Sequence, residues 1–390
     1  MPRPHPRPAT LPSLTGLRFV AALLVFGFHV TLFDSPIPPN EPVNPFADED
    51  LAGALEFLFS KGGYLGVSFF FVLSGFVLTW SAPPRERMRS FWRRRMAKIF
   101  PNHLVMFVLA MTLFAGAVTP LATWLPNVFL LHSFFPAGDV YMSVNSPAWT
   151  LCSELLFYLL FPLLIRPVRR LAPNNLWWCA GAMIAGMVAV QVVNLTLIPS
   201  TPPSPLVPVS VLQFWFGYFF PVPRLFEFGL GMILARMVVL GRMPRVPLWL
   251  AVLSVPAGYG AALAAPFVWG FAVATILPVS LVIVACATAE LADRPTGLRG
   301  PRARWLGEIS FGFYISQGVV VFYGRGLLPP HPFATPAGVL VVVGLFVATL
   351  LAGWALYALV ERPVMRRWAR PGRGLAGTRS PSFATCELDT

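Results

Sequence analysis

The sequence has little charge, almost no lysine and no recognisable cysteine pattern. Only 12% of its 390 residues are charged, whereas about a quarter are charged in an ordinary soluble domain. Its mean hydropathy of +0.68 over the whole length therefore indicates a polytopic membrane protein. The cysteines have neither paired nor metal-ligand spacing, so we interpret them as packing residues and predict no metal site. They are Cys152, Cys179, Cys286 and Cys386.

Long apolar runs recur along the chain. A helix that crosses the hydrocarbon needs about 20 mostly apolar residues, and ten segments qualify. These are 15–32, 63–80, 102–118, 149–165, 176–198, 225–240, 246–264, 266–289, 309–326 and 337–360. No small-residue cleavage site follows the first run, so we interpret it as a retained span and not a signal peptide. We predict an all-α, multi-pass protein of the cell membrane with about ten transmembrane helices.

The basic residues lie in alternate loops. The segment 81–101 holds six arginines and one lysine, whereas the opposite loop 33–62 is acidic. The positive-inside rule then places both termini in the cytoplasm. The net charge of +13 is explained by topology and lipid contact, and nucleic acid is not an expected partner.

Some segments remain outside this set of spans. The apolar pieces 124–135 and 206–220 are interpreted as interfacial or re-entrant elements on the outer side, because a further crossing would reverse the charge pattern. The loop 33–62 contains "PIPPNEPVNP" and is expected to be irregular. We expect one transmembrane domain over 1–367 and a disordered cytoplasmic tail over 368–390.

Few ionisable residues lie inside the spans, where the bilayer makes them costly and functional roles are the first expectation. Arg18 and His29 lie on span 1, in "LRFVAALLVFGFHV". Eleven residues make three helical turns, so both share one face and stand about 16 Å apart along the axis. Glu154 on span 4 is expected at the depth of His29 and could hold its imidazole. The other ring nitrogen could then take a proton from a hydroxyl, which suits acyl transfer to an alcohol.

Each of these residues also has a structural interpretation. A buried histidine such as His29 can form a hydrogen bond that holds two helices together. Arg18 can extend its side chain to the membrane interface and act only as a residue that sets the orientation of the span. His103 beside Pro101 is expected at the cytoplasmic edge, and Arg224 with Glu227 is expected to form a local ion pair.

The basic segment "FWRRRMAKIFPNH" is open to two interpretations. It is either an inside-positive anchor or a clamp for a cytoplasmic anionic cofactor, since arginine suits phosphate. The candidate phosphate ligands are Arg93, Arg94, Arg95 and Lys98, with Arg18 at the same depth.

Five motifs together resemble the membrane-bound acyltransferase family 3. The Arg18/His29 pair with ten residues between its members resembles the family's signature in the first span. The other four matches, in the expected order, are "GYLGVSFFFVLSGFVLT", "FWRRRMAKIFP", "SPAWTLCSELLFYLLFP", and the closing "ISFGFYISQ" with "VERPVMR". The resemblance covers residues 11 to about 367, nearly the whole chain.

The resemblance implies ten spans, an acyl-CoA donor and O-acylation of a sugar or alcohol. It implies His29 as the catalytic base, Arg18 near the coenzyme A, and Glu154 as the motif glutamate. Two positions depart from the family pattern. Leu155 replaces a usual second acidic residue, and Gln317 replaces a frequent histidine, so position 317 can hydrogen-bond but cannot act as a base. Candidate substrate-pocket residues from the motifs are Ser74, Trp149, Tyr158 and Gln317.

The acceptor is left open between two classes. The opening "LPSLTGLRF", the arginine-rich composition and the absence of a Gly-Asp-Ser nucleophile motif resemble the stand-alone macrolide antibiotic O-acyltransferases. We therefore predict acetyl- or propionyl-CoA as co-substrate, a macrolide hydroxyl as acceptor, membrane lipids as partners and no permanently bound cofactor. The alternatives are O-acetylation of a cell-envelope glycan or lipid-linked sugar, and a transporter or flippase.

Overall fold

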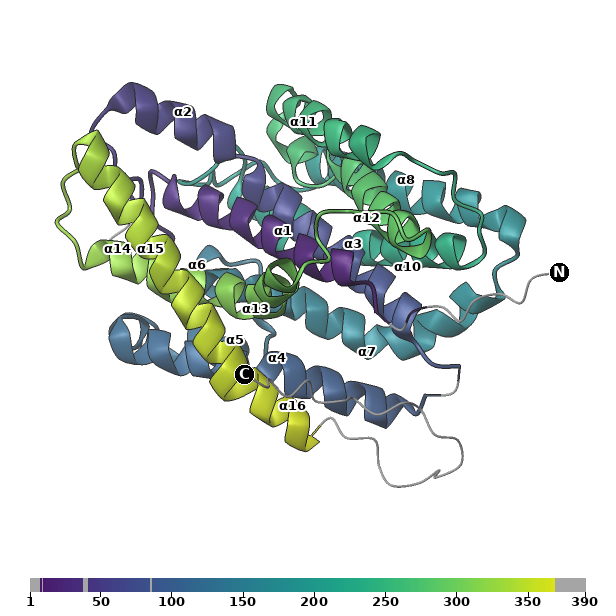
Figure 1. The fold of residues 1–390 in the computed structure, drawn as a ribbon. Helices are drawn as coiled ribbons and strands as arrows, with labels where there is room; N and C mark the ends of the chain where they lie inside the picture. The colour runs from purple at the N-terminus through teal and green to yellow at the C-terminus, as the bar shows by residue number, and fades with distance from the viewer. Residues whose placement is uncertain (1–7, 9, 38–40, 85, 369–390) are drawn as a thin grey trace.

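The computed structural model describes residue 8 and residues 10–37, 41–84 and 86–368. Over these residues the protein is a helical bundle without a β-strand (Figure 1). Each of the ten predicted spans contains one main helix, in some cases with a shorter helical piece beside it. In chain order these helices are α1 (Pro12–Val30), α3 (Gly62–Ser81), α4 (Met88–Leu113), α7 (Trp149–Arg170), α8 (Leu176–Thr196), α10 (Leu225–Val239), α11 (Leu248–Ala264), α12 (Ile276–Leu291), α13 (Pro301–Gln317) and α15 (Thr335–Ala355).

The lengths and surfaces of these helices confirm a multi-pass membrane protein. Within the described residues, seven helical segments are long and apolar enough to cross a bilayer, and α11 and α12 are shorter apolar helices. Large apolar side chains face outward on the peripheral helices, with Trp178 of α8 81% exposed and Leu340 of α15 72% exposed. Such a surface is unfavourable in water and suits contact with lipid. The boundary at residue 367 stays a prediction, and nearly all of the expected tail lies outside the described residues.

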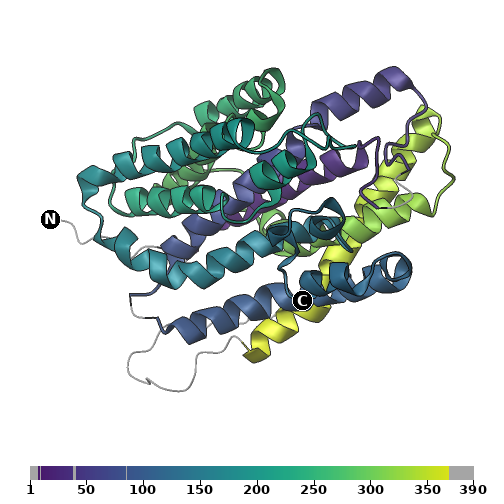
Figure 2. The same cartoon turned by 180° about the vertical axis from the view of Figure 1, so that it is seen from behind.

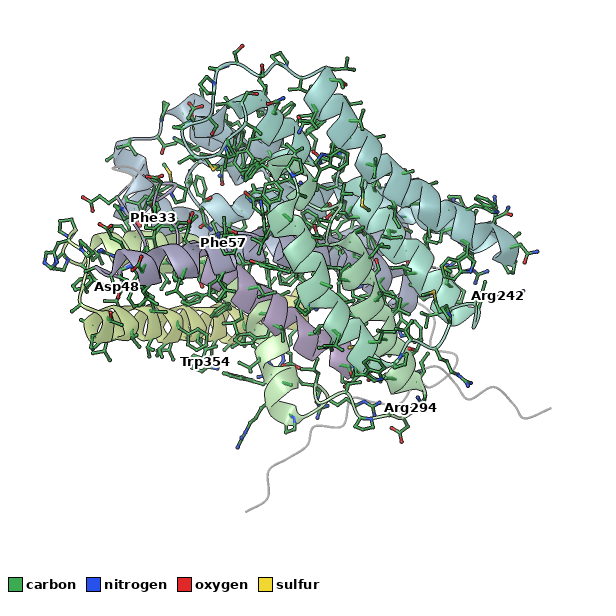
Figure 3. All side chains as sticks on the ribbon, turned by 90° about the horizontal axis from the view of Figure 1, so that it is seen from above. Phe33, Asp48, Phe57, Arg242, Arg294 and Trp354 are labelled. Atoms are coloured by element: carbon green, nitrogen blue, oxygen red, sulfur yellow. The ribbon has the colours of Figure 1, made fainter. Side chains whose placement is uncertain are left out.

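Four helices form the centre of the bundle. Figures 1 and 2 show α1, α3, α7 and α13 between two flanks, one containing α8, α10, α11 and α12 and the other α4 and α15. Helix α15 continues as a helical segment to Trp368. Arg18 near the start of α1 and Glu361 near the end of this α15 segment line one cavity, so these two helix ends lie on the same side of the bundle. Figure 3 shows Asp48 and Phe57 at one end of the molecule and Arg242 and Arg294 at the other. Which end is cytoplasmic stays a prediction from the positive-inside rule.

Short helices cover the acidic end. The loop 33–62 is not irregular throughout, because it contains α2 (Glu49–Phe59). The Asp48 side chain accepts a hydrogen bond from the Leu51 amide at 3.0 Å, and Glu49 and Asp50 lie in the first turn. This arrangement caps a helix N-terminus and complements its dipole. The segments 124–135 and 206–220 form short pieces and not spans, as expected. The remaining short helices are α5 (Leu121–Val128), α6 (Gly138–Tyr141), α9 (Val211–Phe214) and α14 (Gly324–Gly326), whereas the short helix α16 (Arg362–Trp368) lies on the side of the bundle where α1 begins.

The basic segment before span 3 is helical, in contrast to the expected loop. Helix α4 begins at Met88 and continues through Pro101. Arginine and lysine are good helix formers, so the segment extends α4 by more than three turns. His103 therefore lies within the helix and is fully buried, where its Nε2 bonds the Asn127 carbonyl oxygen at 2.8 Å. The expected interfacial position of His103 is wrong.

The contact between α3 and α10 depends on two glycines. A Cβ atom at Gly75 would collide with the Phe228 carbonyl, and one at Gly231 would collide with the Val72 carbonyl. Small residues let membrane helices approach until their backbones are in contact. Helices in lipid are not driven together by the hydrophobic effect, so this close packing is what stabilises their association.

Substitution of Gly75 by valine should therefore destabilise the protein by about 1–3 kcal/mol, because α3 and α10 must separate. Thermal unfolding of the detergent-solubilised protein measures the effect. Gly181→Val in α8 is the matched control, since a Cβ at Gly181 has no heavy atom within 4 Å. Equal unfolding temperatures for the two variants would contradict this account of the contact.

Candidate active site

Two cavities lie end to end in the centre of the bundle. The first, of about 250 Å³, is lined by Arg18, Arg95 and Lys98, and we call it the basic cavity. The second, of about 170 Å³, is lined by His29 and by many aromatic side chains, and we call it the aromatic cavity. Val67 of α3 and Tyr314 of α13 line both cavities. The two spaces therefore meet at these two side chains.

Helix α1 contributes to both cavities. Arg18 and His29 belong to one continuous helix, and the same-face geometry predicted from their spacing places Arg18 in the basic cavity and His29 in the aromatic one. Among the described residues, the Arg18 guanidinium has no ion pair or hydrogen bond. A cation left without such a partner beside a cavity is suited to an anionic ligand.

Only part of the predicted basic cluster faces the basic cavity. Arg95 and Lys98 lie three residues apart on one face of α4 and both line it. Lys98 Nζ lies 3.6 Å from a Glu361 carboxylate oxygen, and the Arg95 guanidinium lies over the Tyr158 ring, 5.6 Å from its centroid. Arg93 and Arg94 point elsewhere on the helix, and Arg94 pairs with Glu86. Neither lines the cavity, so their predicted contact with a phosphate group is not supported.

Glu154 does not contact His29, in contrast to the sequence-based expectation. Its carboxylate lines the basic cavity and accepts a hydrogen bond from the Tyr158 hydroxyl at 2.9 Å. The expectation counted depth from Trp149 as if that residue lay at the membrane surface. Pro147 and Trp149, at the start of α7, line the aromatic cavity together with His29, so this end of α7 already lies at the level of His29. Glu154 is therefore displaced from His29 toward the level of Arg18.

The hydrogen-bond partner of His29 is Gln317. The imidazole Nδ1 lies 2.7 Å from Gln317 Oε1, and Gln317 Nε2 lies 3.4 Å from the Ala22 carbonyl oxygen. A carbonyl oxygen only accepts, so the amide nitrogen must face Ala22 and the amide oxygen must face His29. Nδ1 of His29 therefore donates a hydrogen, and the neutral ring carries its lone pair on Nε2. A histidine held in this tautomer can accept a proton from a hydroxyl group.

The imidazole is also fixed by packing. His29 is 9% exposed, and its ring lies edge-on to Phe322 with centroids 5.1 Å apart. The other candidate pocket residues divide between the cavities. Ser74 and Tyr158 line the basic cavity and Trp149 lines the aromatic cavity, whereas Gln317 acts through His29.

Tyr314 is held in place between the cavities. Its hydroxyl donates to the Pro147 carbonyl oxygen at 3.2 Å and accepts from the Thr150 hydroxyl at 3.2 Å. The phenol ring is therefore anchored to the start of α7, and Val67 of α3 is the other side chain that lines both cavities. Any ligand that extends from the basic cavity to His29 has to pass these two side chains.

Several site residues were not found from the sequence. Glu308, Tyr357 and Glu361 line the basic cavity, and the Tyr357 hydroxyl donates to Glu308 at 2.8 Å. Asn102 Nδ2 also donates to Glu361 at 3.2 Å. The signal for Glu361 was present, because it is the glutamate of "VERPVMR", but that motif was used only as a family match.

Three π-helical stretches lie beside the cavities. Trp215–Phe219 places Tyr218 and Phe219 against the aromatic cavity, Gly318–Tyr323 places Phe322 there, and Leu356–Glu361 brings Tyr357 and Glu361 to the basic cavity. Such stretches occur frequently at functional sites. The predicted ion pair of Arg224 with Glu227 is confirmed, with a distance of 3.0 Å between the charged atoms. Arg224 also donates a hydrogen bond to the Tyr218 carbonyl oxygen, so this pair stabilises the cavity wall near Tyr218.

Other reactive groups lie away from the cavities. Cys152 Sγ is 3.4 Å from His132 Nδ1, but both residues are fully buried and neither lines either cavity. Within the described ranges, no three His, Cys, Asp or Glu side chains are grouped as a metal site requires.

Comparison with known proteins identifies the family. A family model described as an acyltransferase domain matches residues 11–358. The chain belongs to this acyltransferase family. It is 34% identical over 377 residues to the acyltransferase MdmB of Streptomyces mycarofaciens, which covers 94% of each chain. The protein is thus a multi-pass membrane protein of an acyltransferase family.

Two more distant relatives are named as O-acetyltransferases, and one of these names mentions peptidoglycan. The chain is 24% identical over 217 residues to the peptidoglycan O-acetyltransferase OatA of Listeria monocytogenes, across 50% of this chain and 30% of that protein. It is 25% identical over 188 residues to the O-acetyltransferase OatA of Staphylococcus aureus, across 43% of this chain and 27% of that protein. No solved structure matches the chain.

Proposed function

We propose that the protein transfers an acyl group from acyl-CoA to a hydroxyl group of a macrolide, with His29 as the general base. The observation that carries the proposal is the position of the His29 imidazole. Gln317 bonds its Nδ1, so its Nε2 lone pair is available to a ligand in the aromatic cavity. That cavity adjoins the basic cavity, which is lined by three cations. The similarity to the Streptomyces acyltransferase MdmB supports acyl transfer, and the resemblance of the opening "LPSLTGLRF" to the macrolide O-acyltransferases supports the macrolide as acceptor.

The basic cavity suits the donor. Coenzyme A carries phosphate groups, and Arg18, Arg95 and Lys98 offer charged donors for them. Arg18 and His29 are about 16 Å apart along α1, a distance that an extended arm ending in a thioester can cover. That arm would pass between Val67 and Tyr314 and present its acyl carbon to the aromatic cavity. The proposed donors are acetyl- and propionyl-CoA.

The reaction at His29 is a direct acyl transfer. Nε2 of His29 takes the proton of the acceptor hydroxyl while its oxygen attacks the thioester carbonyl carbon. The carbon–sulfur bond breaks, and the imidazolium returns the proton to the leaving thiolate. The products are an ester and free coenzyme A, and no metal or redox partner is needed. Burial of the Cys152–His132 pair away from both cavities supports a transfer without an acyl-cysteine.

A second candidate is O-acetylation of a cell-envelope glycan, which the name of the Listeria relative, a peptidoglycan O-acetyltransferase, favours. The aromatic lining of the cavity around His29 suits the macrolide, because a macrolide offers a large apolar surface to such walls. Membership of an acyltransferase family argues against the transporter alternative.

Loss of the Gln317 hydrogen bond should lower the rate of the chemical step. Gln317→Leu removes the acceptor that holds Nδ1–H, so we expect kcat to fall about 10–100-fold while KM for acyl-CoA stays near that of the unmodified protein. Gln317→Glu keeps an acceptor oxygen and should retain more of the activity. Steady-state kinetics in membranes measure both variants. An unchanged kcat in Gln317→Leu would contradict the positioning role.

The acceptor assignment is tested with the purified protein in lipid nanodiscs. The protein is incubated with acetyl- or propionyl-CoA and either a macrolide or a soluble peptidoglycan fragment, and products are identified by mass spectrometry. We expect an increase in mass of one acyl group on the macrolide and a stoichiometric release of coenzyme A. Acylation of the glycan fragment alone would favour the second candidate, and no acylated product from either acceptor would overturn the proposed function.

A further inference from the structure

We propose that the Val67 side chain limits the size of the acyl group that the protein accepts, because it lies at the junction of the basic and aromatic cavities. The inference rests on the proposed function, since it concerns the donor of that reaction. It goes beyond that function by assigning the choice among acyl groups to one residue.

Helix α3 passes from one cavity to the other at Val67. Before this residue, Gly63 and Tyr64 line the aromatic cavity. After it, Phe71 and Ser74 line the basic cavity. Val67 itself lines both cavities, so the border between them crosses α3 at this position.

Helix α13 crosses the same border at Tyr314. Glu308, earlier in the helix, lines the basic cavity, and Phe322, in the π-helical stretch that follows, lines the aromatic cavity. Among the described residues, Val67 and Tyr314 are the two that line both cavities. An acyl group that enters with its coenzyme A in the basic cavity therefore passes these two side chains on its way to His29.

Tyr314 is not free to move aside. Its hydroxyl is bonded to the Pro147 carbonyl oxygen and to the Thr150 hydroxyl, each at 3.2 Å. Its ring also packs against Phe70, with centroids 5.8 Å apart. A movement of the ring would break two buried hydrogen bonds, which is costly. The space available at the junction is therefore set by the other side chain, Val67.

The backbone that carries Val67 is also fixed. A Cβ atom at the neighbouring Gly66 would lie 2.8 Å from the Ala21 carbonyl oxygen, and one at Gly62 would lie 2.9 Å from the Leu24 carbonyl oxygen. Helix α3 is thus in backbone contact with α1 along this stretch. The Val67 side chain is 3% exposed, and valine has one strongly preferred rotamer in a helix. Neither the helix nor the side chain can yield easily to a bulky ligand.

The junction suits a hydrocarbon chain. Valine has no polar atom, and the Tyr314 hydroxyl is directed to its partners at the start of α7. Each CH₂ group that is buried there should increase the affinity about fourfold, as long as the chain fits. A longer chain should lose this gain, because a close-packed interior does not adapt to extra volume without strain. Affinity should therefore rise with acyl length up to a limit and then fall.

The test measures the binding of straight-chain donors from acetyl-CoA to hexanoyl-CoA, with coenzyme A as the reference. Isothermal titration of the purified full-length protein in lipid nanodiscs, without an acceptor, gives each affinity relative to coenzyme A. In Val67→Ala the limit should move to a chain about one or two CH₂ groups longer, because two methyl-sized groups are removed. In Val67→Ile it should move to a chain about one CH₂ group shorter.

Val77→Ala is the matched control. It makes the same substitution on the same helix, but Val77 lines only the basic cavity. The limit should therefore stay at the acyl length found for the unmodified protein. Because every affinity is compared with that of coenzyme A in the same variant, a lower fraction of folded protein does not change the result.

The outcomes separate this inference from the proposed function. A limit that is the same in Val67→Ala, Val67→Ile and the unmodified protein, or a series without a limit, would overturn the role of Val67 even if a macrolide is acylated. Shifts in opposite directions in the two variants support the role, even if no acceptor is acylated and the proposed function fails. Absence of binding by every acyl-CoA would overturn both.

Discussion

Replacement of His29 by alanine should lower kcat for acyl transfer by about 10²–10⁴-fold, the range that a positioned general base contributes. The imidazole is the proposed proton acceptor for the attacking hydroxyl, and its tautomer is set by the bond between Nδ1 and Gln317 Oε1. Alanine at this position leaves the cavity open but removes Nε2. The hydroxyl then has to react without an imidazole base, because His29 is the one histidine among the described residues that line this cavity.

The matched control is His331→Ala. His331 is exposed and lines neither cavity, so the variant should keep kcat near that of the unmodified protein. Thermal unfolding of each variant shows whether the fold is preserved. A His29→Ala protein that folds and retains more than a tenth of the activity would contradict the role of His29 as the base.

Replacement of Arg18 by alanine should raise KM for acyl-CoA by about 10–100-fold. The Arg18 guanidinium lines the basic cavity without an ion pair to a described residue, and a hydrogen bond from a cation to a phosphate contributes about 1.5–3 kcal/mol. The effect should appear in KM for the donor and not in KM for the macrolide, because the acceptor binds at His29.

Arg242→Ala provides the control for lost positive charge. Arg242 lies in the turn after α10, at the end of the molecule that also carries Arg294, and is not a residue of the basic cavity (Figure 3). Its loss should leave KM for acyl-CoA close to the value of the unmodified protein. Equal effects of the two substitutions would show that only net charge matters and that Arg18 has no specific contact with the donor.

The helices and part of the site followed from local sequence patterns. Ten apolar runs gave ten helices, because span length and apolarity are properties of a continuous segment. Arg18 and His29 were placed correctly on one face because both lie on one helix, where spacing alone determines direction. The helix α2 was missed although "DED" before an apolar run is a capping signal, since proline-rich residues earlier in the same loop dominated the interpretation.

The rest of the site depends on tertiary packing. The depth of Glu154 could not be counted from its own span, because packing places the start of α7, and not Glu154, beside the cavity of His29. The partnership of His29 with Gln317 joins residues 288 positions apart in the sequence. The three π-helical stretches have no local sequence signature, yet they direct Tyr218, Phe322 and Glu361 toward the cavities.

The central claim is that the donor binds in the basic cavity and the chemistry occurs at His29 in the aromatic cavity. Titration of the purified protein with acetyl-CoA tests this separation directly, with the unmodified protein, His29→Ala and Arg18→Ala measured side by side. We predict that His29→Ala binds acetyl-CoA like the unmodified protein although its turnover is lost, and that Arg18→Ala binds it about 10–100-fold more weakly. Normal binding by Arg18→Ala, or a loss of binding in His29→Ala, would contradict the account.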